Sequence, residues 1–282
     1  MKTKFLLLFI FAGLLSACSS DDNNNQQQAP LAAAEYANVQ YGTDPGQTMD
    51  VYLPAGRTAD TKVIILIHGG AWIAGSKEDF ADFIPVIKQE FPDDAIVNIN
   101  YRLATETSAA FPKQMEDLQK VIAFLKNSDY VIDNTYALIG ASAGAHLAML
   151  YGYEYDTAHE VKAICDIVGP ADFFDPEYVS NPLYPFAAQY LLGTTTPTQQ
   201  QIESVSPIAH ITAQSPPTLS FYGGADPLIP ATQGPRLKAA LDEAGVVNEF
   251  NFYATGGHGD WDDATYEDVY LRITSFFEAH FE

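Results

Sequence analysis

The sequence predicts an α/β protein built on a mostly parallel, doubly wound sheet of about eight strands, with a small lid insertion. Apolar runs of strand length alternate along the chain with segments of helical spacing, which is typical of parallel strands that helices cover on both faces. Roughly 250 residues follow a polar N-terminal stretch, enough for one large domain with a well-buried core. We place this domain at 34–282.

The individual elements follow from hydrophobic periodicity. Buried strands are expected at 62–68, 94–102, 135–141, 161–169, 217–223 and 247–254. The segment 47–56 alternates like an antiparallel edge strand. Helices are expected at 79–90, 113–127, 143–153, 232–244 and 265–280. In such a sheet, ligand sites lie beyond the carboxyl ends of the strands.

The N-terminus is expected to direct export and attachment to a membrane. Two lysines precede a short apolar run, as in a secretory signal. The run ends in Leu-Ser-Ala-Cys, which resembles a bacterial lipobox whose cysteine, here Cys18, is diacylated and holds the protein at a membrane. We therefore expect a lipoprotein signal peptide at 1–17; the alternative is an ordinary signal peptide that contains a cysteine.

The stretch after Cys18 is polar and contains no residue that could enter a core, so 18–33 is expected to be a disordered tether. Acidic residues directly after the cysteine resemble the export signal of surface lipoproteins. This favours the cell envelope, at the outer membrane and exposed on the surface, as the location of the protein.

Composition excludes several partners and cofactors. The chain has 14 Lys and Arg against 36 Asp and Glu, a formal net charge of −22, so nucleic acid is not an expected partner. The segment Gly70 to Lys77 resembles a phosphate-binding loop but lacks its Gly-Lys-Ser/Thr ending. No metal-ligand spacing is present, and no cofactor is expected. The other cysteine, Cys165, lies in an apolar run and is expected in the core. The sequence leaves the oligomeric state open.

The central motif is Gly-Ala-Ser-Ala-Gly at 140–144, with a strand pattern before it and a helical pattern after it. This is the G-x-S-x-G context in which a tight turn lifts a serine hydroxyl clear of the sheet, and glycines flank the serine because a Cβ would collide with backbone. Ser142 is therefore the candidate nucleophile. The alternative is a small-residue turn that packs a helix on a strand.

A serine nucleophile needs a base, and the base needs an orienting carboxylate. The acid and then the histidine follow the nucleophile along the chain in this arrangement. Asp226 directly follows a predicted strand, and His258 lies in a glycine-rich loop after the last inner strand. Asp226 could instead cap a turn, and Asp172 and Asp175 are weaker candidates for the acid.

The oxyanion of the transition state needs backbone donors, which in this arrangement come from the residue after the nucleophile and from a loop after an early strand. Ala143 supplies the first. Gly70 and Ala71, in the sequence His-Gly-Gly-Ala-Trp, are the candidates for the second. The segment 172–212 interrupts the strand and helix alternation with prolines and aromatics, and we interpret it as a lid over the site. A surface excursion without substrate contact is the alternative.

Taken together, these motifs resemble a known family. HGGAWIAGSK, INYRLA, IGASAGAHLAML, FYGGADPLIP and GGHGDW follow one another as in the esterase and lipase branch of the α/β-hydrolases, nearest to the bifunctional acetylxylan and feruloyl esterases. The resemblance implies the α/β-hydrolase fold, ester hydrolysis, and the same roles for Ser142, Asp226 and His258. Ala71 departs from the family, where many relatives have a third glycine; its amide would remain a donor if its φ is negative.

The resemblance and the expected anchor imply that the substrate is a small or glycan ester, with acetyl or feruloyl-type acyl groups. Trp72 and Trp261 are candidate substrate contacts. Two alternatives remain: a serine peptidase of the prolyl-oligopeptidase kind, which shares the order of the triad, and a glycan-binding lipoprotein that kept the fold without activity.

Overall fold

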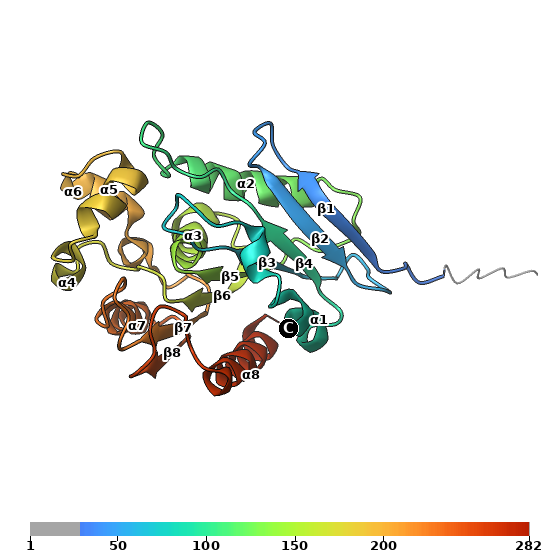
Figure 1. Cartoon of the computed structure of the whole chain (residues 1–282). Helices are drawn as coiled ribbons and strands as arrows, with labels where there is room; N and C mark the ends of the chain where they lie inside the picture. Colours follow the sequence, from blue (N-terminus) through green and yellow to red (C-terminus); the bar gives the residue numbers. More distant parts are fainter. Residues whose placement is uncertain (1–28, 282) are drawn as a thin grey trace, which may run out of the picture.

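An eight-stranded sheet runs through the protein, seen in a computed structural model that describes residues 29–281 (Figure 1). Its spatial order is β1-β2-β4-β3-β5-β6-β7-β8. The strands are β1 (Ala34–Gln40), β2 (Thr48–Leu53), β3 (Val63–Ile67), β4 (Ala95–Ile99), β5 (Tyr136–Ala141), β6 (Val161–Ile167), β7 (Thr218–Gly223) and β8 (Asn248–Tyr253). The predicted α/β-hydrolase fold with a mostly parallel sheet is confirmed.

The strands from β4 to β8 in this order are parallel, and only β1 and β2 run antiparallel to their neighbours. Every residue of β3 and β4 is buried, because helices cover both faces of the parallel part. The expectation that 47–56 forms the edge was wrong. β1 pairs outside β2 and is itself the edge, and its mostly exposed sequence AEYANVQ carries no apolar alternation.

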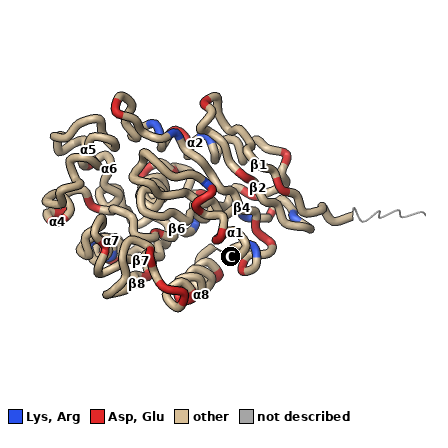
Figure 2. Tube along the Cα trace, in the orientation of Figure 1, with Lys and Arg blue, Asp and Glu red and all other residues tan. Residues whose placement is uncertain are grey.

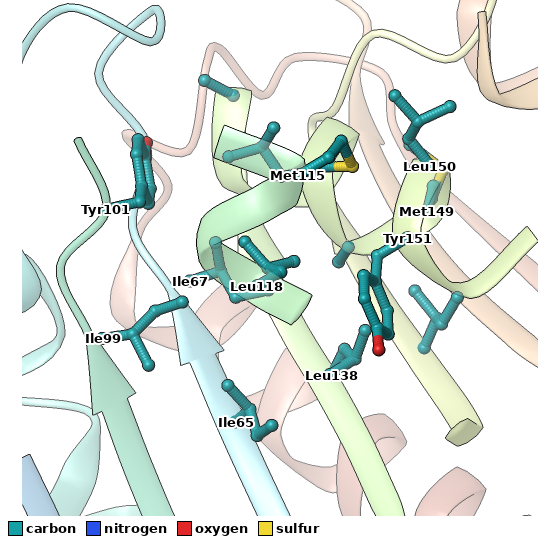
Figure 3. Close-up of a cluster of buried hydrophobic side chains, with 14 of the residues drawn as sticks. Ile65, Ile67, Ile99, Tyr101, Met115, Leu118, Leu138, Met149, Leu150 and Tyr151 are labelled. Carbon is teal, nitrogen blue, oxygen red and sulfur yellow. The ribbon is translucent and has the colours of Figure 1, made fainter. Parts of the chain in front are cut away.

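Five helices cover the two faces: α1 (Ile84–Glu90), α2 (Lys113–Lys126), α3 (Ala143–Leu150), α7 (Gln233–Ala244) and α8 (Asp263–His280). Successive side chains of β3 enter different clusters, since side chains alternate across a strand. Ile65 and Ile67 pack in a cluster with residues of α2, α3 and α7, and Figure 3 shows part of it. Ile64 and Leu66 pack in a second cluster with residues of α1 and α8.

Two expected helices differ in detail. The segment 79–90 is divided into a 3-10 helix, η1 (Lys77–Phe80), and α1, which starts anew with a proline in its first turn. The segment 143–153 forms α3 and then widens into a π-helical turn, η2 (Tyr151–Tyr155).

The segment interpreted as a lid contains α4 (Pro176–Val179), α5 (Tyr184–Leu192), α6 (Gln199–Val205) and the 3-10 helix η3 (Pro207–His210). The helices α4, α5 and α6 lie together at one end of the molecule, opposite β1 (Figure 1). Helix α5 has no charged residue, and α6 has a single glutamate (Figure 2). That this segment acts as a lid over the site stays a prediction.

The signal peptide at 1–17, Cys18 and most of the tether lie outside the described residues. Residues 29–33 precede β1 and are in neither helix nor strand. Among the helices of 29–281, none has the length and hydropathy that crossing a membrane requires.

Candidate active site

Ser142 occupies a strained turn between β5 and α3, with φ 53° and ψ −116°. The neighbouring backbone explains why glycines flank it. A Cβ on Gly140 would lie 2.4 Å from Gly144 O, and a Cβ on Gly144 would lie 2.0 Å from Ile67 O. Because those contacts are with backbone, neither could relax by a side-chain movement, and the turn requires glycine at both places.

The three residues predicted for the triad lie within hydrogen-bond distance of one another. His258 Nε2 lies 2.8 Å from Ser142 Oγ, and His258 Nδ1 lies 2.7 Å from Asp226 Oδ2. Since an ionised carboxylate can only accept, Nδ1 carries the proton and Nε2 is free to accept one from the serine hydroxyl. The Asp226 side chain is 1% exposed and that of His258 is 19% exposed. Of these two residues, only the histidine reaches solvent.

The Asp226 carboxylate is also fixed from its other side. Its Oδ1 accepts hydrogen bonds from the amides of Leu228 and Ile229, at 2.7 and 2.9 Å. The turn-capping role considered for this aspartate is therefore present alongside its contact with the histidine. One oxygen holds the loop, and the other holds His258.

The weaker candidates for the acid are engaged elsewhere. Asp172 is buried and pairs with Arg236. Asp175 caps α4 through its Oδ1, which accepts from the Glu177 amide, and its Oδ2 accepts from Gln233 at 2.8 Å. Neither carboxylate is hydrogen-bonded to a histidine among the described residues.

His146, one turn into α3, is fully buried. Its Nδ1 accepts a hydrogen bond from Trp72 Nε1 at 3.1 Å, so its Nε2 carries the proton and donates to Val205 O at 2.8 Å. Burial lowers the pKa of His146 to about 4, because the charged form loses its hydration. This histidine stays neutral and links the oxyanion loop to the end of α6.

The loop predicted to supply oxyanion donors lies against the nucleophile turn, since a Cβ on Gly69 would approach Ser142 Cβ to 3.3 Å. Within residues 29–281, the amides of Gly70, Ala71 and Ala143 donate to no other group. A developing oxyanion needs two such donors, which the Ala143 amide and the amide of Gly70 or Ala71 are free to supply.

The negative φ on which the donor role of Ala71 was made conditional is not found, because the φ of Ala71 is +49°. Trp72 follows with φ +64°, and its carbonyl is held by the Ala104 amide and by Gln114 Nε2. These hydrogen bonds hold the loop in a left-handed bend, which an alanine can adopt at a cost of about 1–2 kcal/mol. The departure from glycine is therefore accommodated by local strain.

A cavity of about 250 Å³ opens beside the nucleophile. Its wall combines the oxyanion loop, the nucleophile turn, α4, α5 and the loop after Asp226; the lining residues are Ala71, Trp72, Ser142, Ala143, Pro170, Tyr178, Leu183, Phe186, Ala187, Leu228 and Ile229. No charged side chain is among them. Leu183, Phe186 and Leu228 are 39 to 49% exposed, so the opening has an apolar rim.

The two tryptophans predicted as substrate contacts differ in placement. Trp72 lines the cavity, although it is largely buried. Trp261 does not: it packs edge-on against Tyr253, and its Nε1 donates to Gly257 O at 3.1 Å. Its ring thus supports the loop that presents His258, which corrects its assignment as a substrate contact.

Sequence reasoning missed the residues that α4 and α5 bring to the cavity, such as Tyr178 and Phe186. Their only signal was the run of aromatics and prolines in 172–212. Among the described residues, no group of three or more His, Cys, Asp or Glu side chains is arranged to hold a metal ion.

The chain is similar to one protein family and to several curated proteins. A family model described as BD-FAE matches residues 49–241. Esterase LipC of Mycobacterium tuberculosis is 28% identical over 214 residues, which are 69% of this chain and 52% of that protein. Kynurenine formamidase of Danio rerio is 28% identical over 159 residues, 52% of this chain and 50% of that protein. The chain thus spans about half the length of these curated relatives.

Solved structures share the fold. A truncated carbohydrate esterase from gut microbiota has a TM-score of 0.72 at 24% identity, covering 86% of this chain and 96% of that one. An acetyl ester-xyloside bifunctional hydrolase from Caldicellulosiruptor lactoaceticus has a TM-score of 0.70 at 18% identity, covering 89% and 97%.

Proposed function

The chain belongs to the BD-FAE family, and from this premise we propose that it is a serine hydrolase of carboxylic esters. The observation that carries the proposal is the unbroken set of hydrogen bonds from Ser142 through His258 to Asp226, at the edge of an apolar cavity. This geometry meets the needs of a nucleophile, a base and an orienting acid.

In the proposed reaction, His258 takes the proton of the Ser142 hydroxyl as its oxygen attacks the ester carbonyl. The negative charge that develops on the carbonyl oxygen is stabilised by the amide of Ala143 and by that of Gly70 or Ala71. His258 then gives its proton to the departing alcohol, leaving an acyl group on the serine. A water molecule, activated by the same histidine, releases the acid.

This proton transfer assigns the two halves of the ester to different sides of the serine. The leaving alcohol must lie next to His258, which protonates it. The cavity is lined by Ser142, Ala71 and Ala143 but not by His258. We therefore assign the cavity to the acyl half and the more open side, at the histidine loop, to the alcohol.

The substrates that the sequence predicts, acetyl or feruloyl-type esters of glycans or small molecules, can be narrowed by the size of the cavity. At about 30 Å³ for each water-sized group, the cavity of about 250 Å³ has room for roughly eight such groups. An acetyl methyl would fill a small part of it. The apolar wall favours an acyl chain of several carbons or an aromatic ring over acetyl.

Matched p-nitrophenyl esters test this assignment. We expect kcat/KM to be at least about tenfold higher for the hexanoate or ferulate than for the acetate, because each buried methylene contributes discrimination. In Ala187→Phe, which places a ring in the cavity, the preference should shrink while acetate hydrolysis persists. An acetate preference in the parent protein would contradict the assignment of the acyl half.

The rival functions make different predictions in the same assays. A proline-linked anilide cleaved faster than every ester would favour the peptidase. Saturable binding of acetylated xylan without turnover of any ester would favour the glycan-binding protein.

Replacing Gly70 tests the oxyanion loop. Gly70 has φ +106°, and a Cβ would lie 2.1 Å from Ala74 O, so Gly70→Ala must displace the loop. We expect kcat to fall by about 10²- to 10³-fold, the effect of losing one oxyanion donor. The control is Gly245→Ala, which has a similar left-handed φ of +71° with open space around the Cβ, and which should leave kcat unchanged. Equal activity of the two variants would argue against the loop as a donor.

A further inference from the structure

Asp166, a buried carboxyl group that the proposed mechanism does not use, lies on the strand that supports the nucleophile turn. Asp166 is on β6 and has no exposed surface. Its neighbour Ile167 accepts a hydrogen bond from the Ser142 amide at 2.7 Å. Among the described residues, no lysine, arginine or histidine side chain is hydrogen-bonded to Asp166; its partners are Tyr222 and the Gly169 amide.

Next to Asp166, the Tyr222 hydroxyl lies between two oxygen atoms that can accept its proton. Tyr222 Oη lies 2.7 Å from Asp166 Oδ2 and also 2.7 Å from Gly169 O. The Gly169 amide donates to Asp166 Oδ1 at 2.8 Å. A tyrosine hydroxyl has a single proton, so beside an ionised carboxylate it can satisfy only one of the two oxygens. The other would face an oxygen lone pair at the same short distance.

We propose that Asp166 is a neutral carboxylic acid in the folded protein and closes a ring of three hydrogen bonds. In this ring Asp166 Oδ2 donates to Tyr222 Oη, Tyr222 Oη donates to Gly169 O, and Gly169 N donates to Asp166 Oδ1. Each of the three donors is then used once and each short contact has a proton. In a buried, low-dielectric setting, the hydrogen bonds of such a closed ring polarise and so strengthen one another.

The surroundings favour the neutral form. Burial raises the pKa of Asp166 to about 7, because no compensating cation replaces the lost hydration. Among the described residues, the other ionisable groups near the ring are Cys165 beside it on β6, Tyr153 from the η2 turn, Asp226 beyond Tyr222, and His146 of α3, whose amide lies against Gly169 and which burial keeps neutral. None of them carries a positive charge that would stabilise a carboxylate.

The ring fixes the path of the chain from β6 to the cavity wall. Val168 has a left-handed φ of +52°, unusual for a β-branched residue, and its amide is held by Phe221 O. Gly169 packs so closely on α3 that a Cβ would approach Ala145 Cβ to 2.7 Å. The next residue, Pro170, lines the cavity. Asp166 is thus a positioning residue for the cavity wall and the nucleophile turn, whichever acyl group is bound.

The dependence of stability on pH tests the proposal. A carboxyl that is protonated in the folded state and ionised in the unfolded state stabilises the fold fully below about pH 4 and loses this contribution as pH rises through about 7. Asp166→Asn keeps the ring, with the amide NH₂ donating to Tyr222 Oη, but cannot titrate. Relative to this variant, the folding equilibrium constant of the parent protein should fall about tenfold for each pH unit between these limits.

Denaturant unfolding at a series of pH values provides the measurement. The matched control is Asp262→Asn: the carboxylate of Asp262 caps α8, and its pKa is lowered by the hydrogen bonds from Thr265, so its contribution is lost toward acid instead. The same pH dependence in the parent protein and in Asp166→Asn would overturn the proposal.

A second variant and a direct measurement cover the case in which Asp166→Asn does not fold. Tyr222→Phe removes the hydroxyl that would turn to donate to Asp166 once the carboxyl ionised. Because that charge-assisted bond is stronger than the one that the neutral acid donates, its loss raises the pKa of Asp166, and the fall in stability should extend to higher pH than in the parent protein. Infrared difference spectra of the parent protein should show a protonated carboxyl band that disappears as pH is raised past about 7. Spectra without that band would refute a neutral Asp166.

Discussion

Replacing Ser142 with alanine should reduce ester hydrolysis by a factor on the order of 10⁶, which is the effect of removing the nucleophile from a serine hydrolase. The alanine variant retains His258, Asp226 and the amides of the oxyanion loop, so binding and electrostatic stabilisation persist without an attacking atom. We therefore expect residual turnover that is still about 10³- to 10⁴-fold above the uncatalysed rate, measured with a p-nitrophenyl ester at saturating concentration.

The fold of the alanine variant should be intact, because the hydroxyl donates only to His258 and lies beside a cavity. Ser220→Ala is a suitable control. That serine is buried on β7 and is hydrogen-bonded to none of the triad residues; its hydroxyl makes one long 3.4 Å contact with Glu249 O, and its removal should leave kcat unchanged. Turnover near the parent level in Ser142→Ala would show that another residue attacks the ester.

The sequence predicts most of the sheet because its central strands are buried on both faces. The uninterrupted apolar run in β3 leaves few alternatives to a central strand. The edge was harder to predict. β1 is mostly exposed, bulges between Tyr36 and Val39, and depends on its pairing with β2 rather than on apolar alternation. Edge strands carry little information in their composition, since only one side of their backbone is paired.

The predicted triad residues could be placed because each lies in the turn or loop that follows a strand, and the carboxyl ends of parallel strands meet at one edge of the sheet. The φ of Ala71 and the support role of Trp261 could not be predicted from the sequence, because both depend on contacts with distant segments. Trp72 O, for instance, is held by Gln114 of α2, far along the chain. The hydrogen-bond ring of Asp166 is likewise set by how Tyr222 reaches across from β7.

Asp226→Asn should lower kcat by about 10⁴-fold while leaving the site's geometry in place. The asparagine oxygen can still accept from the amides of Leu228 and Ile229, which turns the NH₂ group toward His258 Nδ1. An NH₂ group donates, so Nδ1 must become the acceptor and the ring proton moves to Nε2. Nε2 then faces Ser142 as a donor and cannot take its proton.

The same substitution at the two other candidate acids separates orientation of the base from general destabilisation. Asp172→Asn weakens the pair with Arg236, and Asp175→Asn weakens a cap on α4, but neither group touches His258. Both variants should therefore lose stability with far smaller changes in kcat than Asp226→Asn. If Asp172→Asn or Asp175→Asn lost activity to the same degree while Asp226→Asn remained active, the acid would have to reach the histidine through a rearranged loop, and the assignment of Asp226 would be wrong.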